Sequence, residues 1–298
     1  MKNIATLFLT FLFSLSIFAE VSHSEKDALI KLHKFTNGSQ WTVKWDLSAP
    51  VSTWYGIKLQ DEKVISIKLA NNNLVGEIPA AIDNLFHLQE FDIHKNSISG
   101  VIPATIGNLK DLKVLNLSFN RLLGTIPNSI CKLSNLKALE LYMNALSGAL
   151  PMQMGALKQL EILSLFNNEI VGQIPSSLYD IKTLKTLLLN SNKLTGGLSS
   201  EVVNMTSLEN LSLFDNKMNG QVPFELEKLN NLKEMNISYN MFNGLVSKDL
   251  ATLDTLNMTM INDQGIAVLL DIKTDRNSVI VPEDKFMKYK IGLMLKYK

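Results

Sequence analysis

The chain has 298 residues, of which 46% are hydrophobic and 19% charged, and its formal net charge is +1. This balance argues against a nucleic-acid-binding protein, which normally presents a basic face. A single cysteine, Cys131, excludes an internal disulfide, so the fold must be stable without one.

Residues 1–19 begin with a basic residue, Lys2, and continue as an uncharged apolar run that ends at Ala19. This pattern is typical of a secretory signal peptide that is cleaved near Ala19. An uncleaved membrane anchor is the alternative, but the run is short for a bilayer span. We therefore expect an exported protein, secreted or at the cell surface, with no transmembrane segment after cleavage.

Residues 20–63 precede the repeats described below and are expected to cap their N-terminal end. An amphipathic helix is predicted from Ser24 to about Gly38, with Ser24 as its N-cap residue and Asp27 three residues later. Its apolar face would consist of Ala28, Leu29, Leu32 and Phe35.

The three tryptophans of the chain, Trp41, Trp45 and Trp54, all lie in this N-terminal segment. A tryptophan cluster can form a platform for carbohydrate. A stack of repeats must, however, cover the open end of its core, and aromatic side chains are efficient covers. We therefore interpret the cluster as part of the cap.

Residues 64–265 form an array of repeats with a period of 24 residues. A fixed period of this length indicates a solenoid, in which each repeat buries its apolar face only against its neighbours. The period is marked by an asparagine that recurs eight times without the gain or loss of a residue: Asn72, Asn96, Asn120, Asn144, Asn168, Asn192, Asn216 and Asn240.

Each repeat is expected to contain one short strand. In the stretch from Leu109 to Pro127, Leu115 and Leu117 alternate with polar residues, as in a strand with one buried face. Stacked repeats would join these strands into a parallel sheet, and an inward asparagine amide would satisfy buried backbone groups at the turn. A glycine follows four residues after each asparagine, and in six repeats a proline three residues later. The apolar spacing of three that comes next predicts a short 3₁₀ turn.

The consensus LxxLxLxxNxLxGxIPxxIGxL resembles the plant-type extracellular leucine-rich repeat, found in plant receptor-kinase ectodomains and polygalacturonase-inhibiting proteins. It is also similar to secreted leucine-rich-repeat proteins of bacteria. The resemblance implies an α/β solenoid, a right-handed superhelix with a concave parallel sheet that is capped at both ends. The N-terminal cap lacks the paired cysteines of the plant proteins, which fits a bacterial export route better than a plant one.

The repeat pattern weakens after Asn240. Leu253, Leu256 and Ile261 keep the frame, and Gln264 stands where the next asparagine is due. These positions predict a degenerate ninth turn.

Residues 266–298 are interpreted as a C-terminal cap or tail. Alternating apolar residues at 279–281 and 291–295 indicate short strands. The lysines near the end of the chain would suit a membrane or nucleic-acid contact, but a solvated cap edge is the preferred interpretation.

Side chains that alternate with the buried leucines should face outward on the concave sheet, where apolar and aromatic residues recur on neighbouring strands. Contiguous exposed apolar area usually marks a contact site. A covering loop, or simple tolerance of aromatic residues on a sheet, is the alternative explanation. The predicted binding residues are Val114, Tyr142, Ile162, Phe166, Leu188 and Phe214, with Asp92, His94 and Glu140 at a polar margin.

The sequence contains no motif for catalysis. The four histidines form no metal-spaced cluster, no GxSxG elbow occurs, and the glycines follow the repeat rather than a phosphate loop. We therefore predict a protein that is not an enzyme and that needs no cofactor or metal.

These features, with the resemblance, predict an exported recognition protein whose concave face binds a protein, a peptide or a glycan. One alternative is an adhesion or surface structural component that associates with itself. Another, which follows only from the resemblance, is an inhibitor of an extracellular glycan hydrolase. The sequence leaves the ligand and the oligomeric state open.

Overall fold

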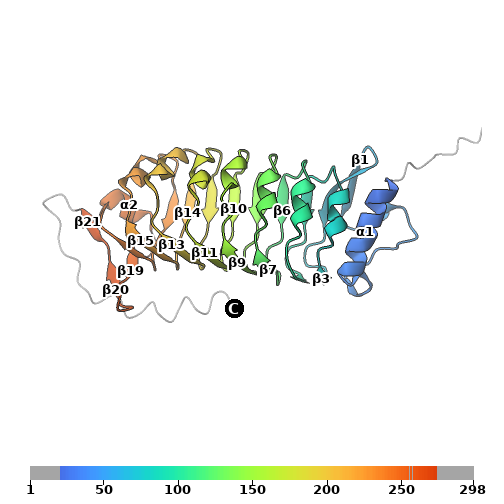
Figure 1. Cartoon of the computed structure of the whole chain (residues 1–298), viewed down its shortest axis with the longest axis horizontal. Coiled ribbons are helices and arrows are strands. Elements are labelled where there is room, and N and C mark those ends of the chain that lie inside the picture. The colour runs from blue at the N-terminus through green and yellow to red at the C-terminus, as the bar shows by residue number, and fades with distance from the viewer. Residues whose placement is uncertain (1–20, 255, 257, 274–298) are drawn as a thin grey trace, which may run out of the picture.

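The protein is an elongated, twisted solenoid in which successive turns of the chain stack side by side (Figure 1). The computed structural model describes residues 21–254, 256 and 258–273. The predicted signal peptide at 1–19 lies outside the described residues. None of the helices described is both long enough and apolar enough to cross a membrane.

The first sheet has nine strands, and all but the first continue from turn to turn in parallel. β1 pairs with β2 in the antiparallel sense and closes the N-terminal edge. Leu139, Leu163 and Leu187 stand in register on adjacent strands, as the 24-residue period predicts. The strands, in spatial order, are β1 (Ile57–Gln60), β2 (Lys63–Lys68), β4 (Glu90–Asp92), β6 (Val114–Asn116), β8 (Ala138–Glu140), β10 (Ile162–Ser164), β12 (Thr186–Leu188), β14 (Asn210–Ser212) and β16 (Glu234–Asn236).

A second, six-stranded sheet forms from the segments that follow the asparagines. This sheet was not predicted from the sequence. The glycine of each segment has a left-handed backbone: Gly196 has φ of +76°, and a Cβ there would come within 2.7 Å of Gln173. The strands are β7 (Leu123–Thr125), β9 (Ala145–Ala149), β11 (Glu169–Gly172), β13 (Lys193–Gly196), β15 (Lys217–Gln221) and β17 (Met241–Asn243), and β3 (Val75–Glu77) pairs separately with β5 (Ser97–Ser99).

Short 3₁₀ turns complete the repeats, as the apolar spacing predicted. Most begin directly after an extended proline, such as Pro127 with φ of −68° and ψ of 138°. These turns are η3 (Ala80–Asn84), η4 (Ala104–Asn108), η5 (Asn128–Lys132), η6 (Met154–Ala156), η7 (Ser176–Asp180), η8 (Ser200–Asn204) and η9 (Phe224–Lys228), and a short helix, α2 (Lys248–Thr252), follows in the next turn.

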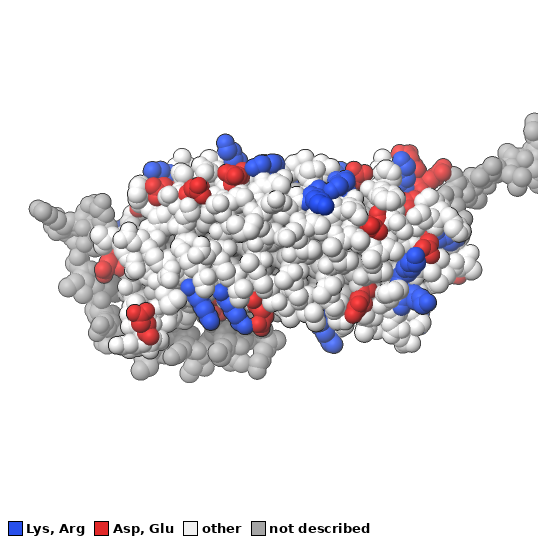
Figure 2. All heavy atoms as spheres, in the orientation of Figure 1, with Lys and Arg blue, Asp and Glu red and all other residues white. Residues whose placement is uncertain are grey.

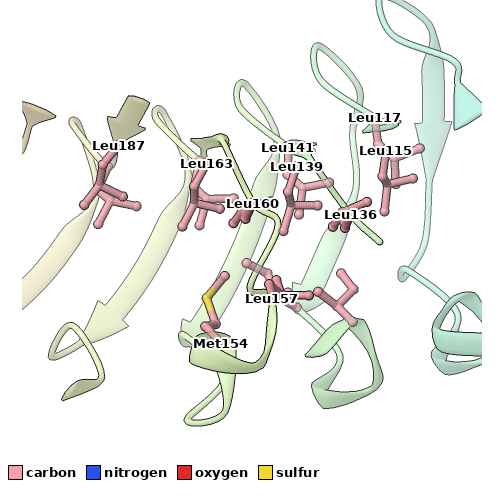
Figure 3. Close-up of a cluster of buried hydrophobic side chains, with 14 of the residues drawn as sticks. Leu115, Leu117, Leu136, Leu139, Leu141, Met154, Leu157, Leu160, Leu163 and Leu187 are labelled. Atoms are coloured by element: carbon pink, nitrogen blue, oxygen red, sulfur yellow. The ribbon is translucent and has the colours of Figure 1, made fainter. Parts of the chain in front are cut away.

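The core runs as one continuous layer along the solenoid. Leucines of the first sheet, such as Leu139 and Leu163, meet Leu157 and Leu160 from the connecting segment (Figure 3), and all four are fully buried. Each buried leucine contributes about 1.5–3 kcal/mol relative to an exposed one. The apolar positions predicted to face inward therefore form the core.

The helix of the N-terminal cap begins two residues earlier than predicted. Helix α1 spans His23–Phe35, and its N-cap residue is Ser22 rather than Ser24, because Ser22 and Glu25 form a reciprocal capping box. Phe35, which was expected on the buried face, is 52% exposed.

The tryptophans follow α1 in a segment with two 3₁₀ turns, η1 (Gly38–Gln40) and η2 (Val51–Thr53). Trp45 stacks on Trp54 with ring centroids 4.7 Å apart, and Trp41 meets Trp45 edge to face at 4.8 Å. All three are at most 6% exposed, so they pack in the core instead of presenting a platform for carbohydrate.

The turn after Asn240 departs from the predicted frame. Met258 and Met260 point into the core, whereas Gln264 is exposed and does not take the place of the ladder asparagine. The Asp254 carboxylate accepts the Ile237 N–H at 2.9 Å, where the equivalent Leu213 N–H donates to the backbone carbonyl of Asn236. The strands predicted at 279–281 and 291–295 lie outside the described residues. The strands found here are β18 (Leu245–Ser247), β19 (Thr259–Ile261), β20 (Ala267–Leu269) and β21 (Asp271–Lys273).

Candidate functional site

The concave face is built from the strands of the first sheet, whose side chains alternate between core and surface. In β10, Leu163 is fully buried and Ile162 is 37% exposed. The Asn168 Nδ2 atom fixes the end of this strand by donating to the Leu165 carbonyl (2.9 Å) and to the Leu141 carbonyl of the preceding turn (3.1 Å). The same bonds recur along the asparagine ladder, so the surface side chains of adjacent strands are held in register.

An aromatic cluster, which consists of Phe119, Tyr142 and Phe166, lies across three consecutive turns of this face. The rings of Tyr142 and Phe166 stack with centroids 4.4 Å apart and an interplanar angle of 14°. Phe119 meets Tyr142 edge to face at 5.3 Å. All three rings are only partly buried, so the cluster presents apolar area to solvent.

A second ring pair lies further along the solenoid, where Phe214 meets Tyr239 at 5.2 Å. The sequence reasoning missed Tyr239 and Phe119, because both stand one residue before a ladder asparagine and outside the alternating strand. Their φ angles are +58° and +52°, and this left-handed turn places each ring beside an aromatic residue of a neighbouring strand. An aromatic residue directly before the asparagine is the signal that would have found them.

The remaining predicted apolar residues also lie on the concave face. Val114 and Ile162 flank Ala138 in register, and Leu188 stands beside Ser164. Val114, Ile162 and Leu188 are each partly or well exposed. The structure therefore places the predicted apolar side chains on one surface next to the aromatic cluster.

The predicted polar margin lies toward the N-terminal end of this face. The His94 Nδ1 atom is 2.7 Å from Asp92 Oδ1, which also accepts the His94 backbone N–H at 3.1 Å. Burial raises the pKa of Glu140, repulsion from Asp92 raises it further, and attraction to His94 partly offsets both effects. The charges of Asp92 and His94 thus act on the Glu140 carboxylate.

A ladder of lysines and glutamates follows the edge at which the chain enters each strand. Glu161 lies 2.7 Å from the Lys185 ammonium and 4.0 Å from that of Lys137, and Lys233 pairs with Glu209. The hydrogen bond and charge of Lys185 lower the pKa of Glu161. On the face seen in Figure 2, charged side chains likewise gather mostly along the long edges and the N-terminal end.

The site offers groups for non-covalent binding. It presents stacked rings, a half-buried carboxylate and small hydroxyls on a rigid sheet. Across the part of the chain that the structure describes, no group of three or more His, Cys, Asp and Glu residues could hold a metal ion.

The sequence matches two family models. The model described as "Leucine-rich repeat region" matches residues 127–283, and the model described as "Leucine rich repeat" matches residues 62–122 and 86–146. The chain is also similar to polygalacturonase inhibitor 1 of Arabidopsis thaliana, with 30% identity over 128 residues that cover 40% of this chain and 39% of the inhibitor.

Two solved structures of related proteins share the fold. The PEPR1–AtPEP1 crystal structure matches with a TM-score of 0.69 and 26% identity, covering 85% of this chain and 42% of that chain. The plant peptide hormone receptor RGFR1 in complex with RGF2 matches with a TM-score of 0.57 and 28% identity, covering 70% of this chain and 36% of that chain. The chain thus spans well under half the length of the inhibitor and of these two receptor chains.

Proposed function

Because the chain belongs to the leucine-rich repeat family, we propose that it is an exported recognition protein whose concave face binds an extended peptide or protein segment. The aromatic cluster carries this proposal. It is exposed on a rigid sheet, and the alternation of β-strand side chains does not require large rings on the solvent face. Rigid aromatic side chains are also the usual anchors of binding surfaces.

A peptide is preferred to a glycan as the ligand, although both stack on tyrosine and phenylalanine. One of the similar solved structures is a peptide hormone receptor in complex with RGF2, at 28% identity to this chain. Binding along the sheet would need no catalytic group, so we propose recognition without catalysis. Export is proposed from the signal-peptide pattern of residues 1–19.

The test is binding of the purified chain to combined peptide and glycan arrays. The variant Tyr142→Ala/Phe166→Ala/Phe214→Ala should lose the hits of the wild type. The control Phe86→Ala/Phe224→Ala removes two rings that are 57% and 65% exposed beside the 3₁₀ turns, and it should keep them. Hits that survive the triple substitution would contradict a concave site, and hits confined to glycans would contradict a peptide ligand.

An inhibitor of an extracellular glycan hydrolase is the second candidate. Its support is the similarity to polygalacturonase inhibitor 1 over 40% of this chain. The ligand would then be a folded enzyme, and wild-type protein would slow a polygalacturonase while giving no array hits. We expect such an inhibitor to present a polar, charge-dominated concave face, and the stacked rings of Tyr142 and Phe166 fit this expectation poorly.

A further inference from the structure

Glu140 is a half-buried carboxylate without a local partner. Glu140 stands in β8 on the concave face, and its carboxylate accepts no hydrogen bond and forms no ion pair with any described residue. Asp92, two strands away, has engaged the nearest imidazole, that of His94, at 2.7 Å. A carboxylate that has lost hydration in this way is stabilised when a cation binds to it.

Ser164 supplies a second unpaired polar group beside Glu140. The two residues are in register on adjacent strands, and Ser164 is only 3% exposed. Its neighbours Leu163 and Leu165 fill the core, so Ser164 points toward the concave side. Its hydroxyl has no hydrogen-bond partner among the described residues. Buried hydroxyls are normally paired, so this one can serve a ligand.

The aromatic cluster borders these two groups. Tyr142 follows Glu140 by two residues, and Phe166 follows Ser164 by two. The stacked pair therefore lies two residues further along the chain than the polar pair, on the same two turns. Aromatic faces attract cations through the ring quadrupole. The cluster already has one such neighbour, because the Lys95 ammonium lies 5.8 Å from the centre of the Phe119 ring.

Resting on the proposed function, we propose that the peptide carries a lysine or arginine whose cationic group binds between Glu140 and the stacked rings of Tyr142 and Phe166. The cation would donate to the Glu140 carboxylate and to the Ser164 hydroxyl, while its aliphatic stem lies on the rings. The complementary charge is what selects this ligand. A neutral sugar would leave the carboxylate without a counter-charge, and an acidic peptide would be repelled by Glu140 and Asp92.

The experiment is selection from a display library of random peptides on the full chain. Selected peptides should share a lysine or arginine next to apolar residues. Replacing that residue by alanine should weaken binding about tenfold or more, as when one partner of a desolvated ion pair is removed. Glu140→Gln should weaken the parent peptide equally, and the two changes together should cost little more than either one alone.

The matched control is Glu169→Gln on the second sheet, where Glu169 is exposed and paired with Lys193. This control changes the net charge by the same amount and should leave binding unchanged. Thermal unfolding of each variant verifies that it is folded.

The outcomes separate the two proposals. Selected peptides without a basic residue, or an unchanged affinity in Glu140→Gln, would overturn the cation site and leave concave peptide binding intact. An equal loss in Glu169→Gln would show general electrostatics and would also overturn it. If the wild-type chain retained no peptide, the proposed function would fail and the cation site with it.

Discussion

Asn168 shows why an asparagine marks every turn. Its Oδ1 accepts the Leu146 N–H at 3.0 Å, while its Nδ2 donates to the carbonyls of Leu141 and Leu165. One amide thus joins backbone groups of two turns, and only asparagine or glutamine carries both a donor and an acceptor in this form. The shorter side chain of asparagine fits between strand and turn. The residue is 9% exposed, so water does not replace these bonds.

The variant Asn168→Ala is therefore expected to lower the free energy of unfolding by about 1–3 kcal/mol, because buried backbone groups lose their partners. Asn190→Ala is the matched control, since Asn190 is half-buried on the concave face and its side chain makes no hydrogen bond to a described residue. Its effect should stay within about 0.5 kcal/mol. Urea unfolding measures both. Equal losses of stability in the two variants would mean that Asn168 does not face inward or that Asn190 does not face solvent.

The raised pKa of Glu140 predicts that the wild type and the variant Glu140→Gln differ in stability by an amount that depends on pH. Burial, with repulsion from Asp92, raises its pKa in the folded chain, despite the opposing attraction to His94. A raised folded-state pKa means that the folded chain binds the proton more tightly, so the stabilising contribution is present at low pH and is lost as the pH rises through the raised pKa. Glu140→Gln removes this loss.

We therefore expect Glu140→Gln to melt at a higher temperature than the wild type at neutral pH. The difference should shrink as the pH falls through the raised pKa and vanish below the ordinary pKa of a glutamate, because wild-type Glu140 is then neutral in both states. Thermal melts of the two proteins across this range measure the difference. A difference that does not change with pH would contradict the expectation.

At the residue scale, the sequence identifies the core more completely than the surface. Leu163 and Leu165 were predicted inward from strict alternation, and both are fully buried. Phe119 was missed, since its position depends on a left-handed turn that leaves no periodic pattern. Ser164 alternates with these leucines and so faces the concave side, but its burial depends on the packing of its neighbours across strands.

The 3₁₀ turns accept either proline or serine at the position directly before the turn. Most are preceded by proline, and η8 is preceded by Ser199, whose φ of −72° and ψ of 147° are those of its proline counterparts. The difference is the N–H group. The Ser199 N–H donates to the Tyr179 hydroxyl at 3.3 Å, and the Ser199 Oγ accepts the Glu201 N–H at 3.1 Å. Proline would remove both bonds.

Ser199→Pro should thus lower the free energy of unfolding by about 1–2 kcal/mol in the wild type, because the Tyr179 hydroxyl, in a residue only 2% exposed, loses its donor. In a Tyr179→Phe background this loss is absent, and the stiffer unfolded chain contributes about 0.4–1 kcal/mol in the opposite direction. The same substitution should then be nearly neutral. Urea unfolding of the four proteins completes the cycle, and an identical effect in both backgrounds would refute the role of the hydroxyl.

The first helix shows what sequence signals leave undecided at the element scale. Ser22 and Ser24 are each followed by an acidic residue three positions later, so either fits an N-cap. Ser22 is the N-cap residue and pairs with Glu25. The Glu25 carboxylate also accepts the Val64 N–H at 3.0 Å, which connects the helix to the first sheet. That tertiary contact is absent from any local pattern, as is the pairing of the extended segments into a second sheet.

The whole molecule follows from its period, because each turn contacts only its neighbours. The parallel sheet and its order were predictable for this reason. The last described turn was not, since Met258 and Met260 fill its core outside the predicted frame of apolar residues. The Asp254 carboxylate there accepts the Ile237 N–H, whereas the equivalent N–H of Leu213 donates to the backbone carbonyl of Asn236.

Deleting residues 169–192 removes one whole repeat and tests this architecture directly. The chain then passes from Asn168 to Lys193 in the same frame, so the Asn216 amide meets the Leu165 carbonyl where it now meets that of Leu189. The shortened protein should fold and unfold cooperatively, with a lower free energy of unfolding because one interface between repeats is lost.

Deleting residues 169–180 instead removes half a repeat and should prevent folding, because every later leucine and asparagine leaves its position in the stack. Circular dichroism and urea unfolding compare the two deletions. The whole-repeat deletion keeps Phe119, Tyr142, Phe166 and Glu140 on their own adjacent turns, so it should also keep the ligand of the concave face. A whole-repeat deletion that folds but loses this ligand would move the binding site toward Leu188 and the second ring pair, since the aromatic cluster would then be intact and insufficient.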